Sequence, residues 1–148
     1  MLLGKLRFCG NGSNGATAWY DGPVLPADYA ADMSVGAAGC DANDSVTEAT
    51  ADRPFDPYSA IKIVGMACTT QAGGTADTNT YQLRSAAGNV TGVTCSVTND
   101  GAAPKTCQVI LAAPVAITAG ATLAVQNTQS GTDDMSAKDM GCEAFYTY

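Results

Sequence analysis

The second half of this chain is a series of short segments rich in Thr and Val, and each segment is bounded by residues that favour turns. Thr and Val suit extended strands, whereas Gly and Asn accept the positive φ angles of tight turns. Short strands at such regular spacing are typical of a β-sandwich or β-barrel. The segments that we predict as strands are residues 61–68, 78–85, 90–98, 106–112, 121–128 and 140–148.

The N-terminal part of the chain adds two further predicted strands. They cover residues 3–9 and 16–20, and the Asn and Gly residues between them supply turn chemistry. Asp21-Gly22-Pro23 is expected to end the second strand. We therefore expect an all-β chain of antiparallel strands.

Residues 24–57 differ from the rest of the chain. They contain seven acidic residues and one Arg, and they follow neither the strand nor the helix period. We interpret them as a long acidic loop insertion with about one helical turn, anchored by Cys40. Since the chain has 148 residues and shows no internal repeat or linker, we predict one domain over residues 1–148.

The charge of the chain limits its partners. The net charge is −7, and the seven Lys and Arg residues are scattered, so we expect no nucleic acid as a ligand. No segment approaches the length of a membrane span, so we expect no membrane partner. Residues 1–8 lack the charged leader and long apolar stretch of a signal peptide, and we expect none.

Six cysteines are widely spaced along the chain, and there is no histidine. This spacing does not match a zinc or iron–sulfur site, whereas an even number of cysteines suits disulfides in an oxidising environment. Cys95 and Cys107 enclose a short loop between two predicted strands, so we predict a disulfide between them. Cys68–Cys142 and Cys9–Cys40 are hypotheses for the remaining pairs, because six cysteines allow about fifteen connectivities. Buried free thiols are the alternative.

Several of these segments together resemble a known family. Tyr81-Gln82-Leu83-Arg84 and Gly88-Asn89-Val90-Thr91 form a strand, a turn and a return strand, followed by Cys95, Cys107 and the strand-like residues 117–125. This order resembles jelly-roll modules of bacteriophage structural proteins and related bacterial surface proteins. Their architecture is similar to the trimeric heads of complement and tumour-necrosis-factor proteins.

The resemblance covers residues 58–148. It departs from the family at Ala121, where the family usually has Asp, and in the acidic insertion. It implies an antiparallel β-sandwich of jelly-roll type, and a fold of this type does not by itself imply a function.

Catalysis has little support in the residue types. Without histidine, a Ser–His–Asp or Cys–His arrangement is excluded within one chain. Ser136 and Lys138 do not lie in a recognisable nucleophile turn, so we do not expect a Ser–Lys nucleophile. Asp133 and Asp134 are better interpreted as part of a solvated loop than as the carboxylate pair of a glycosidase. We expect no enzyme and no catalytic cofactor.

Two binding hypotheses remain. Asp41, Asn43 and Asp44, or the pair Asp133 and Asp134, offer oxygen ligands for a structural calcium ion, although the spacing does not match an EF-hand. Trp19 and Tyr20, with Tyr29, are candidates for stacking against a sugar. Their alternative role is in the core or at a subunit interface.

The combined features predict a non-enzymatic virion structural protein at the surface of the particle. We expect a capsid decoration or cement protein, or a fibre head, that is a homotrimer and contacts the major capsid or tail protein. The alternatives are a receptor- or glycan-binding adhesin or fibre tip, and a subunit of an extracellular filament. A bound sugar that depends on Trp19 would favour the adhesin, and head-to-tail contacts along a polymer would favour the filament.

Overall fold

The computed structural model describes residues 3–11, 17–24, 53–54, 59–70, 75–85, 88–100, 104–131 and 139–148. Within these ranges the chain forms strands and no helix. The strands are β1 (Gly4–Asn11), β2 (Thr17–Val24), β3 (Arg53–Pro54), β4 (Ile61–Thr70), β5 (Thr75–Ser85), β6 (Gly88–Asp100), β7 (Lys105–Ile117), β8 (Thr122–Ser130) and β9 (Asp139–Thr147).

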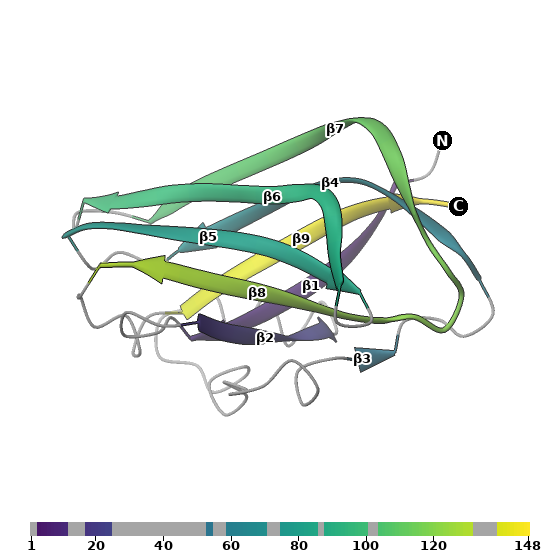
Figure 1. Ribbon diagram of the computed structural model, residues 1–148, viewed down its shortest axis with the longest axis horizontal. Coiled ribbons are helices and arrows are strands. Elements are labelled where there is room, and N and C mark those ends of the chain that lie inside the picture. The colour runs from purple at the N-terminus through teal and green to yellow at the C-terminus, as the bar shows by residue number, and fades with distance from the viewer. Residues whose placement is uncertain are drawn as a thin grey trace.

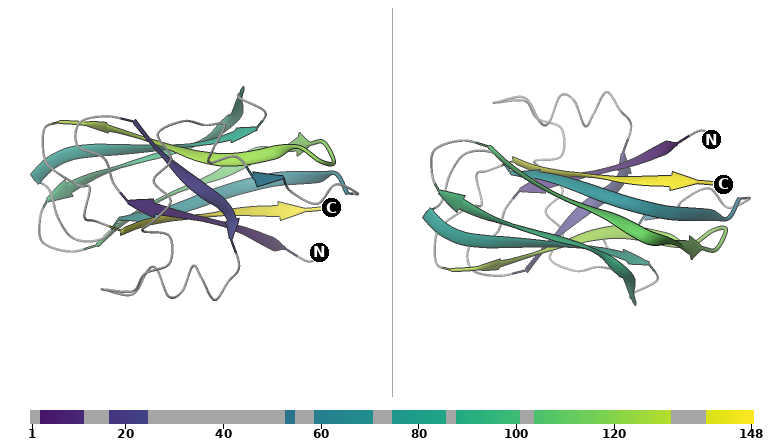
Figure 2. Two further views of the ribbon diagram at one scale, coloured as in Figure 1. Left: turned by 90° about the horizontal axis from the view of Figure 1, so that it is seen from below. Right: turned by 90° about the horizontal axis from the view of Figure 1, so that it is seen from above.

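The strands form two antiparallel layers that face each other (Figures 1 and 2). One layer has the order β1-β9-β4-β7 and the other has the order β2-β8-β5-β6. β1 pairs with β9, β2 with β8, β4 with β7, and β5 with β6. This is a long antiparallel ribbon wrapped into two sheets, which defines a jelly roll. The predicted all-β sandwich of jelly-roll type is therefore confirmed.

The two ends of the sandwich are distinct. β1 begins and β9 ends at the same end, so the N and C labels lie close together in all views (Figures 1 and 2). Gly4 at the start of β1 lies opposite Tyr146 near the end of β9, which also places the two termini at one end of the sandwich. We call this the terminal end. β4 and β6 finish at the opposite end, which we call the far end.

The core lies between the two sheets and follows the period of two that extended strands impose. In the first sheet, one row of opposite residues runs through Leu6, Ala144, Met66 and Val109 across β1, β9, β4 and β7. All four belong to the core or pack against it. The second sheet contributes the buried side chains Tyr81, Leu83, Val90, Val93, Leu123 and Val125.

β2 corrects one prediction about strand boundaries. We expected Asp21-Gly22-Pro23 to end this strand, but β2 continues to Val24. Its first half pairs with β8, whereas Asp21 and Val24 pair with β1 across an irregular register. The strand therefore changes sheets at its middle, where Gly allows a bend and Pro removes only one backbone donor.

A short strand also lies within the segment that we interpreted as an insertion. Arg53 and Pro54 form β3, which pairs with Leu123 and Thr122 of β8. The sequence pattern did not indicate this strand, because two residues are too few to show a period.

Tyr81 gives a testable dependence of stability on pH. Its side chain is buried, and desolvation raises the pKa of the phenol well above its usual value of 10.0. Because the folded pKa is raised, the phenol keeps its proton in the folded protein at pH values where the unfolded chain ionises. The contribution of the buried phenol to the free energy of unfolding is thus fully present below about pH 10. Above that pH it falls by about 1.4 kcal/mol per pH unit. The free energy of unfolding of Tyr81→Phe should fall less steeply above that pH than that of the wild type.

Urea unfolding at a series of alkaline pH values measures this slope. Tyr148→Phe removes the hydroxyl of an exposed tyrosine and is the matched control for the substitution itself. Equal slopes for wild type and Tyr81→Phe would contradict the assignment.

Candidate interaction surface

The outer face of the sheet β1-β9-β4-β7 is apolar near the terminal end. Lys5, Phe145, Gly65 and Ile110 lie opposite one another across the four strands. The neighbouring row faces the core, so alternation directs this row outward. Its side chains lie on the surface of the sheet.

Large exposed apolar side chains gather on this sheet. Among the residues whose burial is described, they are Ile110 (70% exposed), Tyr148 (70%) and Leu3 (54%). Leu3 precedes β1, Ile110 lies in β7, and Tyr148 follows β9. Single exposed apolar residues need no explanation, but a group on one sheet indicates an interaction site. Tyr148 packs edge-on against Tyr146, which faces the core, so it is not part of the outer face. We call the exposed Leu3 and Ile110, with the half-buried Val64 and Phe145, the apolar face.

Local geometry explains why Ile110 is exposed. A Cβ atom at the opposite Gly65 would lie 2.5 Å from the carbonyl oxygen of Val109 and 3.1 Å from Cδ1 of Ile110. The Ile110 side chain therefore lies over a residue that has no side chain to cover it. β7 is also the edge strand of its sheet, so no strand lies beyond it there.

β7 is interrupted beside the apolar face. The register between β4 and β7 passes from Ile63–Val115 to Gly65–Ile110, so residues 111–114 of β7 form a large bulge. Pro114 lies in this bulge, and residues 112–114 are exposed. A bulge and a proline at a sheet edge prevent further strands from pairing there. Contacts at this edge are therefore made by side chains.

Positive charge borders the apolar face. Nζ of Lys5 lies 2.9 Å from Oε2 of Glu143, and Nε of Arg7 lies 3.0 Å from Oε1 of the same residue. Lys5 also lies 5.5 Å from the centre of the Phe145 ring, a cation–π contact. Lys62 is exposed on the same sheet. Among the described residues around the apolar face, three cations thus accompany one carboxylate, in a chain whose net charge is −7.

The outer face of the other sheet has a different character. Nine outward positions on β5, β6 and β8 carry only Thr, Ser and Gln, and the charged Arg84 follows them in the same alternation where β5 reaches the terminal end. The hydroxyls of Thr78 and Thr98 are 2.9 Å apart, as are those of Thr80 and Ser96. This polar face is uncharged at these positions and lacks a large apolar group, so it is a useful reference surface.

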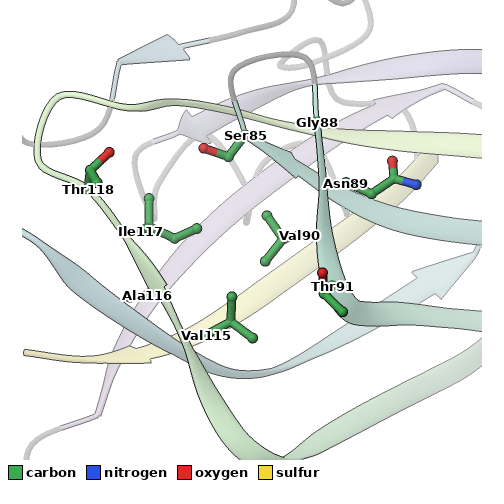
Figure 3. A pocket seen from close by; sticks show the side chains of 9 residues that line it. All are labelled: Ser85, Gly88, Asn89, Val90, Thr91, Val115, Ala116, Ile117 and Thr118. Atoms are coloured by element: carbon green, nitrogen blue, oxygen red, sulfur yellow. The ribbon is translucent and has the colours of Figure 1, made fainter.

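A small groove opens between the two sheets at the terminal end, where β6 and β7 diverge. Its volume is about 250 Å³. Val90, Val115 and Ile117 point into it, and the polar side chains of Ser85, Asn89, Thr91 and Thr118 surround them (Figure 3). This volume is below the range of about 300–1,000 Å³ that ligand pockets occupy. The groove suits contact with one or two side chains.

A polar cluster lies inside the sandwich toward the far end. Nδ2 of Asn127 donates to Oδ1 of Asn79 at 3.1 Å, and Nε2 of Gln129 donates to Oδ2 of Asp77 at 2.8 Å. The hydroxyl of Thr70 donates to Oδ1 of Asn99 at 3.1 Å. All six residues are buried. Sequence reasoning missed this cluster, although the alternation of Tyr81 and Leu83 extends to Asn79 and Asp77 at the same period.

The structure contains two of the predicted disulfides. Cys68 is bonded to Cys142, and Cys95 is bonded to Cys107. The first joins neighbouring strands of one sheet, and the second joins the edge strands β6 and β7 of the two sheets. Cys9 is also disulfide-bonded. Cys40, its predicted partner, lies outside the described residues.

The other predicted site residues are not brought together in the part of the chain that the structure describes. Trp19 and Tyr20 lie in β2 opposite Gln126 and Val125, and their side chains are outside the description. The remaining candidates also lie outside the described residues: Tyr29, Asp41, Asn43, Asp44, Asp133, Asp134, Ser136 and Lys138.

The described residues offer neither a metal-binding cluster nor a membrane-spanning helix. They contain no group of three or more His, Cys, Asp or Glu side chains placed to hold a metal ion. No helix among them is long and apolar enough to cross a membrane. The calcium site therefore stays a prediction.

The fold and the surface together define a disulfide-linked jelly-roll domain with an exposed apolar face. No known protein family matches this chain, and no curated protein does. Among solved structures, it is similar to a chain in the cryo-EM atomic structure of Broad Bean Stain Virus, with 9% sequence identity and a TM-score of 0.36. That similarity covers 99% of this chain and 85% of the other. The resemblance to bacteriophage modules stays a prediction.

Proposed function

We propose that this protein is a structural component of a virus particle, in the role of a capsid decoration or cement protein or a fibre head. It acts by binding its neighbours and not by catalysis. The observation that carries this proposal is the apolar face, because soluble monomers seldom gather large exposed apolar side chains on one sheet. In this role the apolar face is covered by a protein neighbour.

A second copy of the chain is the neighbour that fits best. The apolar face is bordered by Lys5, Arg7 and Lys62, whereas the whole chain is acidic. Residues 24–57 alone carry seven of the fourteen acidic residues. A cationic, apolar face on one copy is thus complementary in charge to the acidic remainder of another. Such a contact joins different surfaces of the two copies, and it forms a ring, such as a trimer, when the rotation between copies closes.

The disulfides support a location outside the cell. Two cross-links tie strands that are already paired or adjacent, so they maintain the fold where no chaperone is present. A particle released from its host is such a setting. The major capsid or tail protein is the expected second partner, and the uncharged polar face is available for that contact.

Co-purification with virus particles tests this function. In particles purified from the lysate of the host that carries this sequence, the chain should be present at a fixed ratio to the major capsid protein. That ratio should be unchanged by a second round of purification. A chain found only in the soluble fraction would overturn the virion role, whatever its oligomeric state.

A further inference from the structure

Three cysteines lie side by side in one row of the sheet β1-β9-β4-β7. Cys68 of β4 is directly opposite Cys142 of β9 on one side and directly opposite Cys107 of β7 on the other. All three belong to the core or pack against it, so their sulfurs face the interior. Cys68 therefore has two neighbours in register, of which it is bonded to one.

The register places Cys107 within bonding range of Cys68. Opposite residues of antiparallel strands alternate between close pairs and hydrogen-bonded pairs, whose Cα atoms lie about 4.5 Å and 5.5 Å apart. The Cα atoms of Cys68 and Cys142 are 4.1 Å apart, so theirs is the close kind. The backbone of Cys68 then points toward β7, and the pair with Cys107 is the hydrogen-bonded kind. A Cα separation of about 5.5 Å is well within the range that disulfides span.

The two disulfides differ in their access to solvent. Cys68 and Cys142 are fully buried, whereas Cys107 is partly exposed and Cys95 is 9% exposed. A thiol in solution therefore reaches Cys95–Cys107 first. Cys9 lies outside this group, because it follows Phe8, the residue opposite Cys142, and so faces the other side of the sheet.

We propose that Cys68, Cys107 and Cys142 form an internal thiol–disulfide exchange site. At this site Cys107, once released from Cys95, forms a disulfide with Cys68 and displaces Cys142. A small aliphatic thiol such as dithiothreitol attacks the sulfur of Cys95 and releases the Cys107 thiolate. This thiolate attacks Sγ of Cys68, so the Cys68–Cys107 bond forms and the Cys68–Cys142 bond breaks. The Cys142 thiolate leaves and takes up a proton.

The electrons of each step balance. The exchange consumes one disulfide and one thiolate and yields one of each, so it needs no oxidant or reductant of its own. The small thiol supplies two electrons when its second sulfur, or a second molecule, resolves the mixed disulfide at Cys95. The products are the free thiol of Cys95 and the oxidised small thiol.

The exchange changes what the cross-links hold together. Before it, one disulfide joins the edge strands of the two sheets and the other joins β4 to β9. After it, the one bond left among these four cysteines joins β4 and β7, which are already paired within one sheet. The covalent tie between β6 and β7 is lost when the small thiol reduces it, and the edge between these strands can open. The site is thus a thiol-sensitive switch, and it is independent of the proposed virion role.

The variant Cys95→Ser tests the exchange directly. It leaves Cys107 free beside the Cys68–Cys142 bond, so exchange needs no added thiol. After incubation at mildly alkaline pH, alkylation of the native protein followed by acid quenching, non-reducing proteolysis and mass spectrometry should show a Cys68–Cys107 linkage and alkylated Cys142. Their share should not change with protein concentration.

Cys107→Ser is the matched control, because it removes the same disulfide but leaves the free thiol on Cys95, outside the row. It should show only Cys68–Cys142 and alkylation only at Cys95. Circular dichroism checks that both variants keep the strand structure. If Cys95→Ser does not fold, wild-type protein treated with less than one equivalent of dithiothreitol should instead show Cys142 alkylated together with Cys95. Alkylation at Cys107 with Cys142 unmodified would overturn the proposal.

Discussion

Replacing Ile110 with Asp should convert the assembled protein into monomers. Ile110 is the most exposed large aliphatic side chain that the structure describes, and it lies on the edge strand β7 at one end of the row that crosses the apolar face. A carboxylate there would have to be desolvated against the neighbouring copy and would repel its acidic surface. Loss of an apolar side chain on which an interface depends costs about 2 kcal/mol, so we expect the dissociation constant to rise by about 30-fold.

Light scattering of the purified protein over a range of concentrations measures this change. The wild type should have a mass that is a multiple of 15.0 kDa, three times that value for a trimer, and Ile110→Asp should have the mass of one chain. Thr128→Asp adds the same charge at an exposed position of the polar face and should leave the mass unchanged. A wild-type monomer at every concentration, or an unchanged mass for Ile110→Asp, would contradict the proposed interface.

Replacing Cys68 and Cys142 together with Ala should cause a larger loss of stability than replacing Cys95 and Cys107. The two residues are 74 positions apart, so their bond closes a long loop in the unfolded chain. In the chain-entropy account, a loop of this length contributes about 4 kcal/mol to the free energy of unfolding. Both sites are fully buried, so the lost sulfur contacts add to this effect.

Urea unfolding without reductant gives the free energy of unfolding of each variant. The Cys95→Ala, Cys107→Ala double variant is the comparison, because its loop of 12 positions should contribute only about 3 kcal/mol. An equal or smaller loss in the free energy of unfolding for the Cys68→Ala, Cys142→Ala variant would contradict the prediction. The longer loop would then not reduce the entropy of the unfolded chain more than the shorter one does. The Cys95–Cys107 double variant also has no Cys107 thiol, so exchange does not complicate the measurement.

Local patterns predicted most of the strands, since alternation and turn residues act over a few neighbours. β4 to β7 each contain the segment that we expected, and β8 and β9 contain theirs except for Ala121 and Tyr148. β2 was predicted too short, because the change of sheet between Tyr20 and Asp21 depends on which strand lies on either side of it. The same local spacing indicated Cys95–Cys107, whose cysteines lie on consecutive strands.

The candidate site was much less predictable. Ile110 and Leu3 have the same residue types as core positions, and the sequence does not say on which face of the sheet they lie. The exposure of Ile110 depends on Gly65 opposite and on the bulge of β7, two facts of register between strands more than forty residues apart. The interior amides Asn79 and Asn127 look like surface residues for the same reason.

By itself the sequence determined the class of fold, the approximate strands and the means of cross-linking, because these follow from residue type and from spacing along the chain. Only the tertiary structure decided which apolar side chains are left outside, and that Cys68 lies between Cys107 and Cys142. Both depend on the register of non-consecutive strands. Register is set by the packing of the whole sandwich, since a shift of one residue would exchange the two faces of a strand.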